Sequence, residues 1–178
     1  KGDPKSGAWY QVGSSDYYYE GVFWSGMPDV NFESQALRRE FEAVMDFWLE
    51  KGAGGFRLDA VKEFYTGAVD KNVEVLSWVN DYVKAAKPGA YLVGEAWEGL
   101  LTYAQYYASG IDSFFDFEFA GPTGVISKTL TYSGEEHSAQ AYAKALCRVQ
   151  NAIREYRADA IDAPFFVNHD MARAAGYM

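Results

Sequence analysis

Three carboxylate side chains stand out in this sequence because each one follows a short apolar or aromatic run. Asp59, Glu95 and Asp170 end the runs Gly-Phe-Arg-Leu-Asp, Tyr-Leu-Val-Gly-Glu and Phe-Phe-Val-Asn-His-Asp. Two carboxyl groups that face each other about 5–5.5 Å apart can hydrolyse a glycosidic bond with retention, because one attacks the anomeric carbon while the other protonates the leaving oxygen. The first hypothesis is therefore glycoside hydrolysis by paired carboxyl groups.

The pair formed by Asp59 and Glu95 has the spacing of one βα repeat. Neighbouring strands lie about 4.7–4.9 Å apart, so the required separation is attainable at one rim of a parallel sheet. Arg57 projects to the same side of its strand as Asp59, where a guanidinium would keep that carboxylate ionised. Glu95 lies among apolar and aromatic residues, which raise the pKa of a carboxyl group towards that of a general acid.

Each residue taken alone has a simpler explanation. An Asp at the end of a strand is often a helix N-cap or a turn residue. His169 and Asp170 also fit a simple hydrogen-bonded pair. Three such residues, each at the end of a predicted strand, favour a catalytic site.

The elements that must position these residues alternate between helices and strands. Apolar residues at helical spacing predict helices over residues 34–51, around 73–86, over 99–109 and around 142–153, while short apolar runs predict strands at 54–59, 90–96, 113–119 and 164–170. Strict alternation implies parallel βαβ units, which occur in doubly wound sheets and in closed barrels. Polar residues at the carboxyl ends of several strands, and no Gly-rich dinucleotide turn, favour part of a (β/α)8 TIM barrel within the α/β class.

Residues 1–33 differ from the rest of the chain. They are rich in Gly, Ser, Asp, Tyr and Trp without a sustained period, which predicts a long structured loop region instead of a helix or strand. The expected division is therefore residues 1–33 as a separate region and residues 34–178 as barrel.

Composition excludes several classes of protein. The 178 residues are 49% hydrophobic and 17% aromatic, which favours a globular core, and the net charge of -9 with dispersed basic residues argues against nucleic acid as a partner. No apolar run approaches the roughly 20 residues of a membrane span. Cys147 is expected to be a buried thiol on a helix, and with His137 and His169 it has no recognisable metal-ligand spacing, so no metal site is predicted in this chain.

Four segments together resemble the α-amylase family, glycoside hydrolase family 13. Residues 55–62 resemble its nucleophile motif, residues 94–97 its acid/base motif and residues 165–170 its stabiliser motif. Residues 27–31, Met-Pro-Asp-Val-Asn, match a signature near the end of the domain that the family inserts after the third barrel strand. The chain would then hold about strands 4 to 7 of the barrel, with the end of the inserted domain B-like region at residues 1–33.

The resemblance implies a role for each matched residue. Asp59 would form the glycosyl-enzyme intermediate, Arg57 would hold it, and Glu95 would act as acid and then base. Asp170 would be the third catalytic carboxylate. Sugar contacts would come from Lys62, Trp97, Asn168 and His169, with Lys62 and Trp97 on the leaving side; core packing is the alternative for Trp97.

Two departures from the family pattern matter. Many α-amylases have His after the motif lysine, whereas this chain has Glu63, as in some cyclomaltodextrinase- and neopullulanase-like members. Because that position contributes to the family's structural calcium site, calcium in the full-length protein is possible but in doubt. The third-strand motif with an Asn-His pair is not in these residues. We therefore expect a segment of a longer enzyme that is unstable or inactive in isolation.

The expected activity is hydrolysis of α-1,4-glucosidic bonds in starch or maltooligosaccharides by double displacement. Within the same mechanism, a cyclomaltodextrinase or neopullulanase, an α-glucosidase and a glucosyltransferase stay open. A non-catalytic assembly subunit is the alternative from another class. Location in the cell is open, with secretion from a bacterium favoured, and any targeting segment would lie outside these residues.

Overall fold

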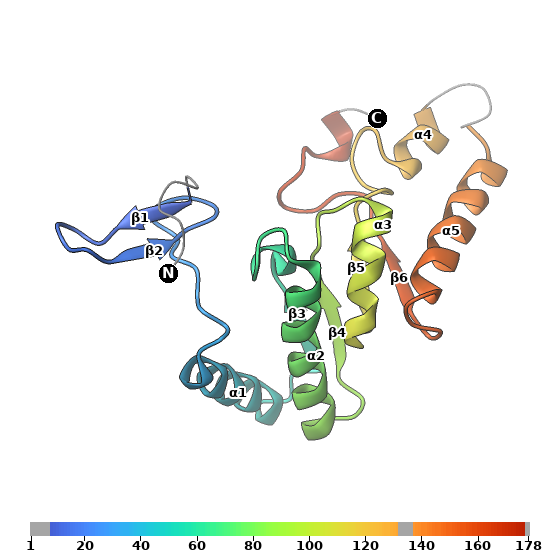
Figure 1. Ribbon diagram of the computed structural model, residues 1–178. Coiled ribbons are helices and arrows are strands. Elements are labelled where there is room, and N and C mark those ends of the chain that lie inside the picture. Colours follow the sequence, from blue (N-terminus) through green and yellow to red (C-terminus); the bar gives the residue numbers. More distant parts are fainter. Residues whose placement is uncertain (1–7, 132–136, 177–178) are drawn as a thin grey trace.

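The computed structural model describes residues 8–131 and 137–176, and Figure 1 shows their arrangement. A parallel sheet follows a small hairpin in the chain. The hairpin consists of β1 (Trp9–Gln11) and β2 (Tyr18–Glu20), paired antiparallel. The loop region predicted for residues 1–33 is therefore wrong for these two short segments, whose alternation was too brief to give a sequence signal.

Four parallel strands form the main sheet in the order in which they follow one another in the chain. They are β3 (Gly55–Leu58), β4 (Tyr91–Gly94), β5 (Ser113–Asp116) and β6 (Ile161–Pro164). The register places Arg57 opposite Val93, and Phe114 opposite Asp162. Sequential parallel order with helical connections is the pattern expected for part of a (β/α)8 barrel.

Helices connect the strands, and Figure 1 shows α2 and α3 along one face of the sheet. The helices are α1 (Gln35–Glu50), α2 (Val69–Ala86), α3 (Leu100–Tyr103), which continues into the 3-10 helix η2 (Ala104–Ser109), α4 (Val125–Thr131) and α5 (Ala139–Arg154). Ser34 and Ser138 cap α1 and α5, because each hydroxyl accepts a hydrogen bond from a backbone N–H in the first turn. No helix of the described residues is long and apolar enough to span a bilayer.

The core lies between the sheet and this helical layer. Leu92 and Phe114 point from the strands, while Leu76, Tyr107 and Ile153 meet them from α2, η2 and α5, and all five are fully buried. Burying one such side chain contributes about 1.5–3 kcal/mol. The sheet face that carries Leu92 and Phe114 therefore packs against the helices, and the side chains that alternate with them point to the opposite face.

Two further predictions need correction. The strand predicted at residues 164–170 is instead β6 and ends at Pro164, because Phe165 is held by ring contacts with Phe115 and Phe117 instead of a strand ladder. Cys147 is exposed instead of buried. On α5 the buried residues are Val149 and Ile153, and a position two residues before Val149 points to the opposite side of the helix.

Gly55 gives a direct test of the sheet. Its φ is +151°, and a Cβ there would lie 1.7 Å from the backbone oxygen of Tyr91, its partner in the register. We predict that Gly55→Ala in the complete enzyme lowers the free energy of unfolding by about 3 kcal/mol or more, because backbone has to move. Thermal denaturation would measure this. Gly54→Ala is the matched control, since nothing lies within 4 Å of its Cβ; equal melting temperatures for the two variants would contradict the register.

Two carboxyl groups lie on the helical side of the sheet, where Asp116 is fully buried and Asp162 is half-buried. Asp116 and Asp162 each have an Oδ2 atom without a hydrogen-bond partner in the described part of the chain. Burial raises the pKa of Asp116 to about 6, against the lowering effect of Tyr103 and Arg148. Burial, and then the charge of Asp116, raise the pKa of Asp162 to about 7. At pH values between 3.8 and these raised pKa values, each group therefore keeps a proton that it would lose in the unfolded chain.

This burial predicts a pH dependence of stability. The ordinary pKa of both groups is 3.8, so stability falls as pH rises from there through the folded pKa values, and it levels off above them. Asp162→Asn should therefore raise the melting temperature relative to wild type more at about pH 8 than at about pH 5. Asp159→Asn is the control, because Asp159 is exposed and Arg157 lowers its pKa; a pH-independent effect of Asp162→Asn would refute the burial of its charge.

Candidate active site

Strand alternation places Arg57, Asp59 and Glu95 on the sheet face away from the core. Arg57 is in register with Val93, and successive strand residues point to opposite faces, so Asp59 and Glu95 continue the face that Arg57 begins. Asp59 directly follows the last residue of β3, and Glu95 directly follows the last residue of β4. Because the strands are parallel, both side chains lie at the same rim, as predicted.

The Arg57 guanidinium contacts both carboxyl groups. Its Nη1 lies 2.6 Å from Asp59 Oδ1, and its Nη2 lies 2.8 Å from Glu95 Oε2. The two environments differ: the Asp59 side chain is 74% exposed and that of Glu95 is 9% exposed. One group is thus open to attack a ligand, while the other is held in an apolar setting.

Burial raises the pKa of Glu95, and its hydrogen bond with Asp59 raises it further. The Ala60 N–H and the Arg57 charge act in the opposite direction. A carboxyl group that keeps its proton beside an exposed carboxylate is what general acid catalysis next to a nucleophile requires. The geometry therefore suits proton donation by Glu95 and nucleophilic attack by Asp59.

The backbone joins the two strand ends on both sides of these residues. The Glu95 N–H donates to the Leu58 carbonyl at 2.9 Å, and the Val61 N–H donates to the Glu95 carbonyl at 2.9 Å. Between them, Ala60 has a φ of +43°, which is a strained value for a residue with a Cβ. Its N–H points to Glu95 Oε2 at 3.4 Å. The turn after Asp59 is thus hydrogen-bonded to the Glu95 side chain.

Lys62 and Glu63 lie on the short 3-10 helix η1 (Val61–Glu63). Lys62 Nζ is 3.5 Å from both Glu63 Oε1 and Glu98 Oε1, and Glu63 Oε2 accepts a hydrogen bond from Thr66 at 2.7 Å. Glu63 is therefore engaged with neighbours of its own. The described residues contain no group of three or more Asp, Glu, His or Cys side chains that could hold a metal ion.

Asn168, His169 and Asp170 follow β6 at the same end of the sheet. The Asp170 N–H donates to Asn168 Oδ1 at 3.0 Å, and His169 Nε2 lies 3.2 Å from Asp170 Oδ2. Within residues 8–131 and 137–176, no hydrogen bond or ion pair joins Asp170 to Asp59 or Glu95. The structure thus assembles two of the three predicted carboxyl groups through Arg57, and the third stays a prediction.

Aromatic rings line the rim beside Glu95. Trp97 stacks on Phe117 with a centroid distance of 4.4 Å and an angle of 18°, and half of its surface is exposed. Phe117 meets Phe165 edge to face, Phe165 meets Phe115, and the Arg57 guanidinium lies 6.0 Å from the Phe115 ring. The phenylalanines were missed as site residues. The signal was the aromatic run at residues 113–119 on a predicted barrel strand.

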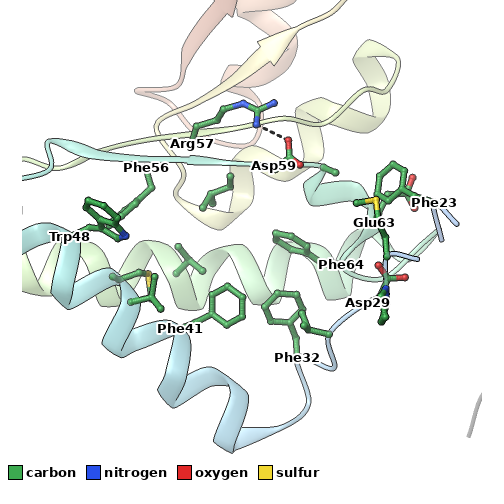
Figure 2. Close-up of a pocket in the computed structure, with 18 residues that line it drawn as sticks. Phe23, Asp29, Phe32, Phe41, Trp48, Phe56, Arg57, Asp59, Glu63 and Phe64 are labelled. Atoms are coloured by element: carbon green, nitrogen blue, oxygen red, sulfur yellow. Dashed lines mark hydrogen bonds and ion pairs between the residues drawn. The ribbon is translucent and has the colours of Figure 1, made fainter. Parts of the chain in front are cut away.

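A cavity of about 530 Å³ opens along β3 on the side away from β4. Figure 2 shows Phe32, Phe41 and Phe64 on one side of β3 and the ion pair of Arg57 and Asp59 on the other. Of the predicted site residues, Arg57 and Asp59 line this cavity, but Glu95 does not. Its mostly apolar lining suits packing of apolar side chains better than a hydroxyl-rich sugar. Arg57 and Asp59 lie at its polar end.

Comparison with known proteins agrees with this geometry. The family model "Alpha amylase, catalytic domain" matches residues 4–178. Alpha-amylase 3 of Dictyoglomus thermophilum is 35% identical over 173 residues, which cover 97% of this chain and 32% of that protein. Glucan 1,6-alpha-glucosidase of Streptococcus pneumoniae is 29% identical over 124 residues, 64% of this chain and 23% of that protein.

Solved structures give the same result. Eubacterium rectale Amy13B superimposes with a TM-score of 0.90 at 43% identity, over 96% of this chain and 33% of that one. The alpha-amylase from H. orenii superimposes with a TM-score of 0.74 at 30% identity, over 92% of this chain and 32% of that one. The chain spans about a third of the length of these relatives. It belongs to the α-amylase family, glycoside hydrolase family 13, and is part of the catalytic (β/α)8 barrel.

Proposed function

We propose that these residues are the central part of a retaining α-glucan hydrolase that cleaves α-1,4-glucosidic bonds in starch or maltooligosaccharides. The observation that carries this proposal is the single guanidinium shared by Asp59 and Glu95 at the ends of neighbouring parallel strands. The match to an alpha-amylase over 97% of the chain supports the choice of substrate. The hairpin and the residues up to 33 then form the end of the domain inserted after the third strand.

The first chemical step uses the difference between the two carboxyl groups. An Asp59 oxygen attacks the anomeric carbon while the Glu95 proton moves to the glycosidic oxygen, so the leaving sugar departs as a neutral alcohol. The bond from sugar to Asp59 is an ester. Arg57 orients Asp59 before the attack, and burial keeps the proton on Glu95 until the leaving oxygen takes it.

The second step reverses these roles. Glu95, now ionised, takes a proton from a water molecule whose oxygen attacks the anomeric carbon, and the Asp59 carboxylate is released. Arg57 stabilises the negative charge as it returns to Asp59. Asn168, His169 and Asp170 bind ring hydroxyls at the cleavage position, and Lys62 contacts the sugar on the leaving side. These sugar contacts rest on the motifs and on the placement of the residues at the same rim.

The two carboxyl groups make separable predictions in the complete enzyme. Asp59→Ala should lower kcat on maltooligosaccharides about 10⁴-fold or more, because no intermediate forms. Glu95→Gln should cause a similar loss on maltooligosaccharides but a much smaller loss in the first step on a dinitrophenyl α-glucoside, whose leaving group needs no proton. Steady-state and burst kinetics would measure both.

Exposed positions on the helices supply the controls for these variants. Asp81→Ala on α2 and Glu155→Gln after α5 repeat the two substitutions away from the rim and should leave turnover unchanged. Unchanged turnover in Asp59→Ala would overturn the proposal. No turnover by the wild-type enzyme would favour the non-catalytic assembly subunit instead.

Glu63 keeps a second substrate class open within the same mechanism. It stands where many α-amylases have His, and it contacts Thr66 and Lys62, the residue that the motif assigns to the sugar on the leaving side. Product profiles on starch, pullulan and cyclodextrin distinguish the alternatives. Preferred cleavage of starch supports the α-amylase assignment, whereas preferred cleavage of cyclodextrin or pullulan would replace it with a cyclomaltodextrinase or neopullulanase.

A further inference from the structure

Trp97 is an unusual residue at this rim because it is both well packed and half exposed. One face of the indole stacks on Phe117 with the rings nearly parallel, and half of the residue's surface stays open. An exposed tryptophan without support rotates about two side-chain torsions and loses that freedom when it binds a ligand. Stacking on Phe117 removes much of this cost before any ligand arrives.

Phe117 is itself fixed from a different strand end. Its ring meets Phe165 edge to face at 5.0 Å and 87°, and Phe165 meets Phe115 at 5.7 Å and 72°. Trp97 follows β4, Phe117 follows β5 and Phe165 follows β6. The three rings therefore form one row across three strand ends, and the row reaches Arg57 through Phe115.

The neighbours of Trp97 indicate which part of a substrate this row meets. Trp97 lies two residues after the general acid, and the next residue, Glu98, pairs with Lys62. The general acid faces the oxygen of the departing sugar, so the first group beyond it is that sugar. A flat indole offers the apolar face of a pyranose ring a stacking surface that requires no hydrogen-bond partner.

We propose that Phe117 is a positioning residue that holds the Trp97 indole as a fixed platform for the sugar on the leaving side. This inference rests on the proposed function. Phe117 does not touch the reacting atoms; it acts by keeping one face of Trp97 presented at the rim. Its removal should weaken binding of substrates that have a leaving-side sugar and leave the chemistry at Asp59 and Glu95 intact.

Substrates with and without that sugar test the proposal in the complete enzyme. Maltotriose has a sugar on the leaving side, whereas α-maltosyl fluoride has only fluoride there and forms the same intermediate. Phe117→Leu, which keeps apolar volume but removes the ring, should lower kcat/KM on maltotriose about fivefold to tenfold and change kcat/KM on the fluoride less than about twofold. Phe117→Tyr should restore the maltotriose value, because it keeps the ring.

Two more variants complete the experiment. Trp97→Ala should show the same substrate selectivity, and adding Phe117→Leu to it should cause little further loss, because Phe117 acts through Trp97. Tyr156→Ala, at an exposed aromatic residue after α5, is the control and should leave kcat/KM on both substrates unchanged. Equal losses on both substrates for Phe117→Leu, or no loss on maltotriose, would overturn the inference. A wild-type enzyme that turns over neither substrate would instead overturn the proposed function.

Discussion

The Arg57 guanidinium carries one positive charge and lies against two carboxyl groups from neighbouring strands. This contact is possible because β3 and β4 run parallel in a register that puts Asp59 and Glu95 at equal height beyond the last ladder residues. A shift of the register by one residue would turn one carboxyl group to the helical face of the sheet. The position of Gly55, whose Cβ would collide with the Tyr91 backbone, shows how tightly that register is set at the other end of the strand.

Carboxyl groups on the two faces of the sheet have different surroundings. On the helical face, Asp116 is fully buried and Asp162 is half-buried, and the pKa of each is raised well above its ordinary value. On the opposite face, Glu95 is also buried, but the Arg57 charge and the Ala60 N–H lie beside it and lower its pKa. Contact with Arg57, which also binds the exposed Asp59, thus distinguishes Glu95 from the carboxyl groups on the helical face. A raised pKa alone would not identify the site.

Much of this architecture follows from sequence patterns, and the failures have physical causes. Residues such as Leu37, Phe41 and Val44 give α1 a clear helical period, and apolar runs mark β3, β4 and β5. The last strand was predicted too late in the chain because Phe165 is as apolar as a strand residue, although tertiary ring contacts hold it. The hairpin was missed because three-residue strands are too short to show a period. The sequence predicted that Asp59 and Glu95 lie at the ends of neighbouring strands and that Arg57 lies beside Asp59. No sequence pattern could show that the Arg57 guanidinium would also contact Glu95.

The main-chain bonds on both sides of Ala60 determine how the site can vary. The Leu58 carbonyl and the Val61 N–H are hydrogen-bonded to the Glu95 backbone, so the main chain, together with Arg57, sets the spacing between Asp59 and Glu95. Trp97 and Phe117 lie at the same rim but take no part in these main-chain hydrogen bonds. Under the proposed function, substitutions of these two residues would change which glucan binds, while the configuration at the anomeric carbon of the product would stay the same.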